Sequence, residues 1–456
     1  MPNTYTFTKD GAMLKKQDMP NKSDDPARRI PRDTQNAVLA MQSPKYRQWF
    51  SPQVNADALL EGLTNVCSQY ELSVGLIDKF LLLKNRHLNF IIDNSVSMDA
   101  TSDVLFEEAH SALRTNYSSL PMSKRKHLAQ LGENELMMTR WGETENRLHI
   151  MIDFLAYIPT ESITISLLND QNGKFNVNDE KQTISADMRK SCTPEEFKKM
   201  AHNIISRIFQ REPYGLTPLK QALHRAFKSD EHMMMHYVLT DGEPSDCSTK
   251  NLAELITTRG LLRSELHKIS NKANRHPVNL ISCTNEDLQY FKEIDKNALY
   301  VDETDDYIQE KREVLNAQGE TIPFTKGLWI LCQLVGALDK DLDNLDEKKE
   351  LSLEFLSKLL GRNVTAADYD YYKMNHPNYL LSDRASARSV RTQSFFDQQP
   401  DTPRRSPHEN NQQHTTCDKV TAYIIVFAFV LLTAAIAYNT DDDDDDYDDD
   451  NTCTIS

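Results

Sequence analysis

Between residues 88 and 301, short apolar runs alternate with longer amphipathic segments, and this alternation restricts the fold more than any other feature. The apolar runs, each of strand length, are Leu88–Ile92, Ile163–Leu168, His236–Thr240, Val278–Cys283 and Ala298–Val301. Apolar residues at helical spacing occupy 143–157, 194–211, 218–228, 251–271 and 286–294. Continuous apolar strands that alternate with helices predict an α/β fold, with a doubly wound, mostly parallel sheet covered by helices on both faces.

The segments on either side of this alternation are expected to differ in their order. Apolar residues at helical spacing over 54–84 predict an amphipathic helical segment packed on the α/β domain. Three further helices are expected at Asp305–Gln318, Phe324–Leu338 and Leu342–Leu360. The expected organisation is a disordered N-terminal segment at 1–53, helices at 54–84, an α/β domain at 85–303 with an insertion at about 101–141, a helical extension at 304–361 and a disordered linker at 362–419.

A membrane span is predicted near the C-terminus. Residues 420–438, VTAYIIVFAFVLLTAAIAY, form an uncharged and mostly apolar stretch. At about 1.5 Å per residue it approaches the ~30 Å hydrocarbon thickness of a bilayer. Lys and Arg occur before this stretch and not after it, which predicts a cytosolic main body and an acidic tail, 439–456, on the far side. We therefore expect a single-pass, tail-anchored membrane protein.

The acidic tail contains two further signals. Its last four residues, beginning at Cys453, match the C-a-a-X pattern for prenylation. Prenylation takes place in the cytosol, so lipidation of Cys453 competes with the predicted translocation of the tail. The Asp run at 441–450 could bind calcium loosely, but a flexible run lacks the preformed geometry of a calcium loop. A solvated, self-repelling tail is the simpler interpretation.

Composition excludes several classes of function. The formal net charge is −16, and no basic stripe typical of nucleic-acid binding is present, so nucleic acid is not an expected partner. The seven cysteines are scattered without a C-x-x-C pair, which predicts neither a disulfide framework nor a zinc site made of thiols. The first 25 residues lack an apolar run, so no signal peptide is expected. These features favour a main body in a reducing, cytosolic compartment.

Three polar motifs are expected at one edge of the sheet. D-N-S-V-S directly follows the first apolar run, T-D-G ends the third, and G-L-T-P-L leads into a helical pattern. Their candidate ligands are Asp93, Ser95, Ser97, Thr217 and Asp241. Carboxyl ends of parallel strands share one edge, and oxygen ligands without Cys or His favour Mg²⁺, Mn²⁺ or Ca²⁺ over zinc. The alternative is that the Asp and Ser side chains only cap the helix that follows.

In this order, D-x-S-x-S, G-x-T-P-L and T-D-G resemble the metal-ion-dependent adhesion site of the von Willebrand factor A family, over about residues 86–303. The resemblance implies that Ser95, Ser97 and Thr217 supply hydroxyl ligands. It also implies that Asp93 and Asp241 bind the ion directly or through water, and that a partner's Glu or Asp completes the coordination. The sequence departs from the family at Val96, where many members have glycine, and in the long polar insertion.

These motifs predict a binding protein rather than an enzyme. The sequence contains no nucleophile elbow, P-loop, dinucleotide-binding or zinc-protease motif. We expect a membrane-anchored, metal-dependent module that captures an acidic side chain of an intracellular partner. One alternative is a structural adaptor that binds through the 304–361 or 54–84 helices, with the metal only stabilising the fold. Another, by family analogy alone, is a partner of an AAA-type ATPase. The partner's identity, the oligomeric state and the membrane involved are left open.

Overall fold

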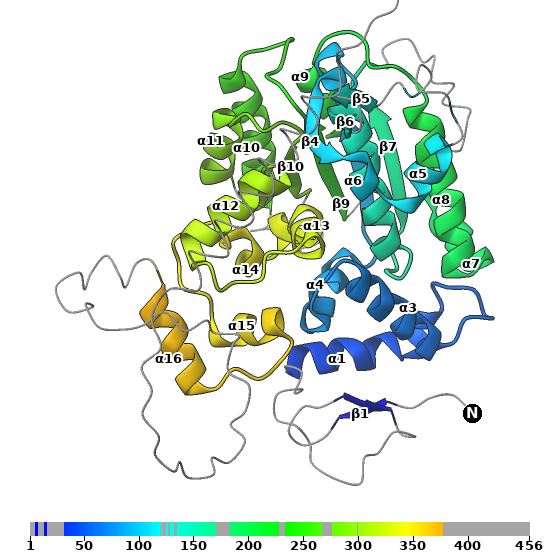
Figure 1. The fold of residues 1–456 in the computed structure, drawn as a ribbon, viewed down its shortest axis with the longest axis vertical. Helices are drawn as coiled ribbons and strands as arrows, with labels where there is room; N and C mark the ends of the chain where they lie inside the picture. Colours follow the sequence, from blue (N-terminus) through cyan, green and yellow to red (C-terminus); the bar gives the residue numbers. More distant parts are fainter. Residues whose placement is uncertain are drawn as a thin grey trace, which may run out of the picture. The chain divides into compact units, whose positions relative to one another are not determined.

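The protein is an α/β structure built around one mostly parallel sheet (Figure 1). The computed structural model describes residues 5–7, 13–15, 32–118, 120, 125, 128–131, 135–169, 183–227, 233–266, 276–298 and 300–376. The sheet order is β11-β10-β9-β3-β7-β8. Its strands are β3 (His87–Ile92), β7 (Ser162–Leu167), β8 (Thr183–Ser185), β9 (Met234–Thr240), β10 (Val278–Ser282) and β11 (Val301–Thr304). The edge strand β8 is antiparallel, and the other neighbours pair in parallel.

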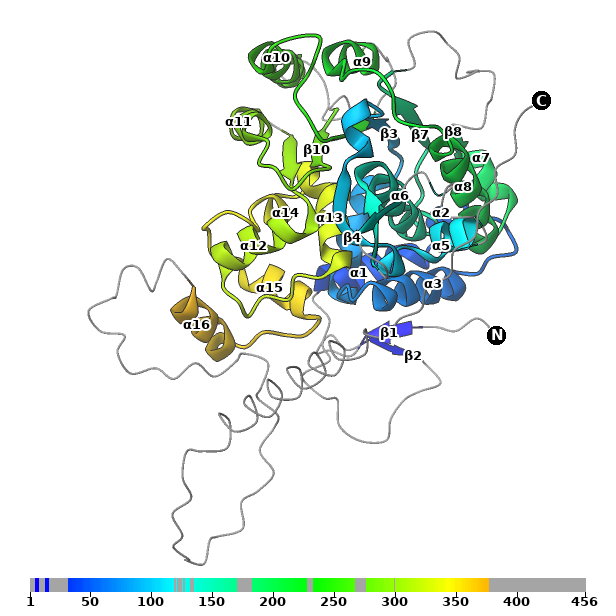
Figure 2. The ribbon, with the colours of Figure 1, turned by 45° about the horizontal axis from the view of Figure 1, so that its top comes forward.

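Helices cover both faces of this sheet (Figures 1 and 2). One face packs against α6 (Arg140–Leu155) and α13 (Lys326–Val335), with α3 (Ala56–Gln69) and α8 (Pro194–Phe209) beyond them. The other face packs against α9 (Leu219–Ala226), α10 (Thr249–Leu266) and α11 (Gln289–Asn297). The strands alternate accordingly: Phe90 and Ile92 point to the first core, and Ile91 points to the second. The predicted mostly parallel α/β sheet is thus confirmed.

The direction of winding reverses at β3. From β3 the chain adds β7 and β8 on one side, then returns to place β9, β10 and β11 on the other. Because β3 and β9 are parallel neighbours with Ile92 opposite Leu239, their carboxyl ends lie together. A reversal of this kind leaves a crevice at the strand ends, which is the usual ligand position in open α/β sheets.

The helices after the last strand differ from the predicted extension. All described side chains of α13 from Gly327 to Val335 are buried, and they join the same apolar core as β3 and β9. This helix is therefore a layer of the α/β domain rather than an added module. The predicted Leu342–Leu360 helix is broken into α14 (Lys340–Asp343) and α15 (Leu353–Leu360), because Ser352 caps a new helix by accepting from the Phe355 amide.

Two stretches expected to be disordered contain helices. At the N-terminal side lie α1 (Arg32–Met41) and α2 (Pro44–Arg47), and Met41, Tyr46 and Phe50 are buried in the main core. At the C-terminal side, α16 (Ala366–Asn375) lies within the predicted linker. The disorder prediction was wrong at these helices because Pro44 starts a helix instead of interrupting order, and a few well-spaced apolar residues anchor each segment.

The polar insertion is ordered where it is described. Its strands β4 (Thr101–Leu105), β5 (Leu128–Leu131) and β6 (Glu135–Thr139) form an antiparallel sheet in the order β4-β6-β5. With α5 (Ser111–Ser118) they bury a small apolar cluster of their own. The remaining described strands and α-helices are the antiparallel pair β1 (Tyr5–Phe7) and β2 (Met13–Lys15), with α4 (Ile77–Phe80), α7 (Ala186–Ser191) and α12 (Tyr307–Gln318).

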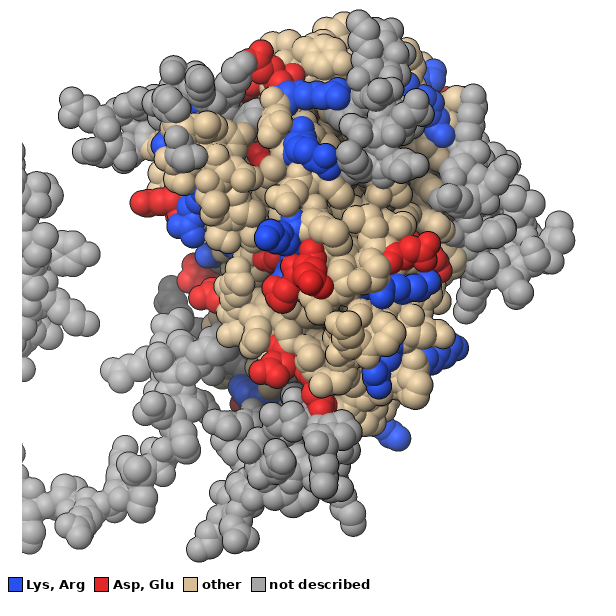
Figure 3. Space-filling view, turned by 90° about the vertical axis from the view of Figure 1, so that its right-hand side faces the viewer, with Lys and Arg blue, Asp and Glu red and all other residues tan. Residues whose placement is uncertain are grey.

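Several sequence predictions fall outside the described residues. The predicted span 420–438, the Asp-rich tail and Cys453 all lie there. No helix within the described ranges is long and apolar enough to cross a bilayer. The face on the right of Figure 1 carries acidic and basic side chains in small mixed groups (Figure 3).

Candidate metal site

Two carboxylates meet at the reversal point of the sheet. Asp93 directly follows β3, and its amide donates to the Leu239 carbonyl of β9 at 2.8 Å. Asp241 directly follows β9. Both residues are buried, and Asp93 has no exposed surface. The parallel pairing of β3 and β9 therefore brings together two acidic residues that are 148 positions apart in the sequence.

A chain of oxygen atoms connects the two loops. The hydroxyls of Ser95 and Ser97 are 2.9 Å apart, and Ser97 Oγ donates to Asp241 Oδ1 at 2.8 Å. Adjacent oxygen ligands of an octahedral Mg²⁺ stand about 2.9 Å apart, since each lies about 2.0–2.1 Å from the ion. The larger Ca²⁺ holds its oxygens further apart. The three oxygens lie at hydrogen-bond distance from one another, a spacing that an octahedral Mg²⁺ could also bridge.

The capping alternative does not account for Ser95. This residue precedes a short 3₁₀ helix, Val96–Asp99, but its side chain makes no capping hydrogen bond. Its backbone amide instead donates to Asp93 Oδ1 at 2.8 Å, while the Thr240 hydroxyl donates to Asp93 Oδ2 at 2.5 Å. These bonds fix the Asp93 carboxylate and leave the Ser95 hydroxyl directed toward Ser97.

The third motif lies against the first through backbone contacts. Gly215 has φ +83°, a conformation that favours glycine, and its carbonyl accepts from the Val96 amide at 3.3 Å. The Tyr214 amide donates to the Asn94 carbonyl at 2.7 Å. Thr217 is therefore close to the D-N-S-V-S loop in the fold, and it is buried. Its carbonyl accepts from the amides of Leu219 and Ser245, which anchors the loop.

Burial disfavours the ionised form of the Asp93 side chain. It raises the pKa of Asp93 to about 6 from an ordinary 3.8, the nearby Asp241 adds to the effect, and the hydrogen bonds from Thr240 and Ser95 oppose it. A buried carboxylate that is costly to ionise without a counter-charge is well suited to a bound divalent cation.

The raised pKa predicts that Asp93→Asn stabilises the metal-free protein at neutral pH. Between about pH 4 and 6 the folded state binds more protons at Asp93 than the unfolded state does, so stability falls as pH rises through this window. The neutral asparagine side chain avoids that loss, and we expect a gain of up to about 3 kcal/mol at pH 7.5 that shrinks toward pH 4. Urea unfolding in EDTA at both pH values measures it. A variant that is less stable at pH 7.5 would contradict this assignment.

Arg140 contributes a cation to the site that sequence reasoning missed. It is the first residue of α6, and its Nη1 is 2.8 Å from Asp241 Oδ2. The Asp241 side chain has no exposed surface, so this ion pair is largely shielded from water. No motif or spacing in the sequence identifies Arg140 as part of the site. It follows β6 of the insertion directly, and only the folded chain brings it next to Asp241. The guanidinium thus neutralises a carboxylate that a bound ion would also need.

We expect Arg140→Gln to bind Mg²⁺ more tightly than the wild type. The ion would no longer compete with the guanidinium for Asp241, and a tenfold gain in affinity corresponds to about 1.4 kcal/mol. Calorimetric Mg²⁺ titration measures the effect. Lys326→Gln is the matched control, because Lys326 is a half-exposed cation paired with Glu108 rather than with Asp241. Weaker binding by Arg140→Gln would show that the arginine supports the ion site instead of competing with it.

Exposed apolar side chains surround the candidate site. Val96, Tyr214 and Leu216 are 61%, 49% and 71% exposed. All three belong to the loops that carry the Ser and Thr hydroxyls, and the Val96–Gly215 hydrogen bond holds these loops together. Exposed apolar groups around a polar centre are typical of protein-binding surfaces.

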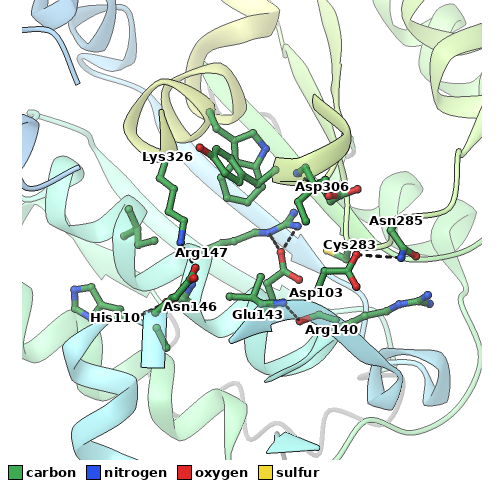
Figure 4. Close-up of a pocket in the computed structure, with 18 of the residues that line it drawn as sticks. Asp103, His110, Arg140, Glu143, Asn146, Arg147, Cys283, Asn285, Asp306 and Lys326 are labelled. Atoms are coloured by element: carbon green, nitrogen blue, oxygen red, sulfur yellow. Dashed lines mark hydrogen bonds and ion pairs between the residues drawn. The ribbon is translucent and has the colours of Figure 1, made fainter. Parts of the chain in front are cut away.

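A cavity of about 510 Å³ opens beside the site (Figure 4). Arg140 belongs to both, because it lines the cavity and pairs with Asp241. Other charged residues that line the cavity include Asp103, Glu143 and Arg147, and Arg147 forms an ion pair with Glu143 at 2.6 Å. The cavity thus offers charged groups of both signs next to the candidate metal.

Comparisons of the chain with family models, curated proteins and solved structures give no match. The likeness of the three motifs to the von Willebrand factor A family therefore rests on the residues themselves.

Proposed function

We propose that this chain is a protein-binding module of von Willebrand factor A type, in which a divalent cation, best Mg²⁺, captures an acidic side chain of a partner. One observation carries the proposal: the Ser95, Ser97 and Asp241 oxygens are linked at 2.8–2.9 Å where the sheet reverses. In the bound form Ser95, Ser97 and Thr217 would hold the ion, with Asp93 and Asp241 acting directly or through water. The ion would supply a positive charge that a partner's carboxylate completes.

The surroundings of the site support a protein partner over a small substrate. The exposed apolar residues Val96, Tyr214 and Leu216 surround the polar centre, and a partner that covered them would bury apolar surface around the metal–carboxylate bond. Such a bond is strongest where water is excluded. The charged cavity next to Arg140 would receive side chains that flank the acidic residue.

The setting of this module remains part of the proposal. The apolar stretch 420–438 supports a single C-terminal membrane span, with the main body cytosolic and the acidic tail on the far side. The expected linker, 362–419, would let the site reach partners near the same membrane.

The adaptor alternative receives less support. It requires the helices after residue 303, or those of 54–84, to offer a free binding surface, and among them α13 is buried from Gly327 to Val335. Deleting 304–361 would remove this core helix and unfold the domain, so the deletion cannot separate the two functions. Substitution of an exposed residue can: Ile308 of α12 is 48% exposed.

Partner capture with and without Mg²⁺ tests the proposal. Solubilised membranes are passed over the immobilised wild type, Asp93→Asn and Ile308→Ala, each with Mg²⁺ and with EDTA. The proposal expects a protein retained by the wild type and Ile308→Ala in Mg²⁺, and lost from Asp93→Asn or in EDTA. Retention that survives EDTA and Asp93→Asn but is lost on Ile308→Ala would replace it with the adaptor function.

A further inference from the structure

Three histidines gather on the side of α6 that faces α5 and α8. His110 directly precedes α5, His149 lies on α6 and His202 lies on α8. Each ring offers one nitrogen as a possible ligand, and these three nitrogens all lie within 4.8 Å of one another. The ring centroids are 4.9–5.3 Å apart. Because the three come from different elements, no spacing in the sequence marks them as a group.

Asp153 holds two of these rings. Its Oδ2 accepts from His110 Nε2 at 2.9 Å, and its Oδ1 accepts from His202 Nε2 at 3.2 Å. Tyr70 also donates to it at 2.7 Å. The Asp153 carboxylate thus accepts three hydrogen bonds, from His110, His202 and Tyr70. A carboxylate behind the imidazole is the usual second layer around a metal-binding histidine.

One nitrogen of His149 and one of His202 face each other. With Nε2 of His202 held by Asp153, its Nδ1 lies 2.9 Å from Nδ1 of His149, so these two nitrogens share one proton. Burial lowers the pKa of His149 well below its ordinary value, and the neighbouring His202 and His110 lower it further. An imidazole nitrogen that has given up its proton can bind a metal. The carboxylate Glu145 Oε1 lies 3.5 Å from its other nitrogen.

We infer that His110, His149 and His202 form a second metal site, which takes a nitrogen-preferring divalent ion, best Zn²⁺. Imidazole nitrogens suit Zn²⁺, whereas oxygen ligands suit Mg²⁺, so this site is chemically distinct from the one at Asp93. The ion would displace the proton shared by His149 and His202. His110, which bonds Asp153 and accepts from the Ala112 amide at 3.0 Å, would exchange one of these bonds for the ion.

The position of the site indicates what a bound ion would do. Its ligands join the insertion, through His110, to the two helices α6 and α8 of the main domain. The side chains of His110, His149 and His202 are 6%, 0% and 13% exposed, and a cavity of about 430 Å³ lined by His110, His202 and Asp153 gives an ion access. Lys198 also lines this cavity, where it is paired with Glu195 at 2.8 Å. The ion would thus clamp the insertion onto the domain.

Zinc titration of the chelator-treated, full-length chain tests the inference. The measurement is calorimetric, in excess Mg²⁺ so that the Asp93 site does not contribute. We expect one Zn²⁺ per wild-type chain and an affinity at least about 100-fold lower for His110→Gln and His202→Gln, since even loss of a second-layer partner costs 10–100-fold. His224→Gln, which changes an exposed histidine of α9, and Asp93→Asn are matched controls that should bind Zn²⁺ like the wild type.

Two further measurements keep the result interpretable. Zn²⁺ should raise the urea midpoint of the wild type but not of His202→Gln, after circular dichroism has established that the metal-free variant is folded. Zinc-edge X-ray absorption of the wild type needs no variant and should show three imidazole ligands. Equal affinity in the wild type and both His→Gln variants, or a zinc spectrum without imidazole, would overturn the site and leave a hydrogen-bonded network. The Asp93→Asn variant keeps the two proposals apart: if it binds Zn²⁺ like the wild type, the histidine site does not depend on the Mg²⁺ site at Asp93.

Discussion

Asp93→Asn should bind Mg²⁺ far more weakly than the wild type while the protein stays folded. The substitution keeps the size of the side chain but removes the negative charge that the ion requires at the end of β3. The remaining oxygens, from two serines, a threonine and Asp241, carry a single charge that Arg140 already neutralises. We expect the Mg²⁺ affinity to fall by at least about 100-fold, or about 2.7 kcal/mol. Calorimetric titration measures the loss.

The matched control for this variant is Asp99→Asn. Asp99 is an exposed carboxylate at the end of the 3₁₀ helix Val96–Asp99, which follows Asp93 closely in the chain, so both substitutions remove one charge from the same region. Asp99→Asn should bind Mg²⁺ within a factor of about two of the wild type, because exposed charges interact weakly through water. If both variants lost Mg²⁺ equally, the loop would attract the ion only by its net charge, and no built site would exist.

Gly75→Ala should destabilise the whole protein. A Cβ at this position would overlap the Lys358 carbonyl oxygen and lie 2.9 Å from two further backbone atoms of that residue. Backbone atoms of α15 cannot move aside cheaply, so we expect the free energy of unfolding to fall by about 3 kcal/mol. Two hydrogen bonds fix this contact: the Ser73 hydroxyl donates to Lys358 O at 2.7 Å, and the Thr34 hydroxyl donates to Gly75 O at 2.5 Å.

This experiment tests whether the N-terminal helices and α15 belong to the folded core. Urea unfolding of Gly75→Ala is compared with that of Gly242→Ala, where an added Cβ meets no atom within 4 Å. The control should remain within about 0.5 kcal/mol of the wild type. Equal stability of the two variants would mean that the segment around Gly75 packs independently of α15.

The central sheet was accessible to sequence reasoning because its strands are continuous apolar runs. The predicted Leu88–Ile92, Val278–Cys283 and His236–Thr240 runs differ from β3, β10 and β9 by no more than two residues at either end. The last strand begins at Val301 rather than Ala298, since Ala298 ends α11 as its C-cap. The short antiparallel β8 was missed because three residues carry too little pattern.

The candidate site was predictable only in part. Strand ends alone placed Asp93 and Asp241 at one edge, and their loops do meet there. Whether they bind an ion remains a prediction. Arg140 and the histidine cluster could not be found in this way, because each depends on how α6 packs against segments that are distant in the sequence. The N-terminal helices were missed for a similar reason: Tyr46 becomes a core residue only beside the turn that follows α6, where its hydroxyl donates to the Tyr157 carbonyl at 2.8 Å.

A crystal of the protein grown with Mn²⁺ and acetate would test the central claim most directly, because Mn²⁺ is visible by its anomalous scattering and acetate imitates a partner's carboxylate. We expect one anomalous peak about 2.1 Å from the Ser95 and Ser97 hydroxyls, with an acetate oxygen at the open position. Arg140 should have moved away from Asp241. A map without a peak between these loops, with Arg140 still paired to Asp241 at 2.8 Å, would contradict the account.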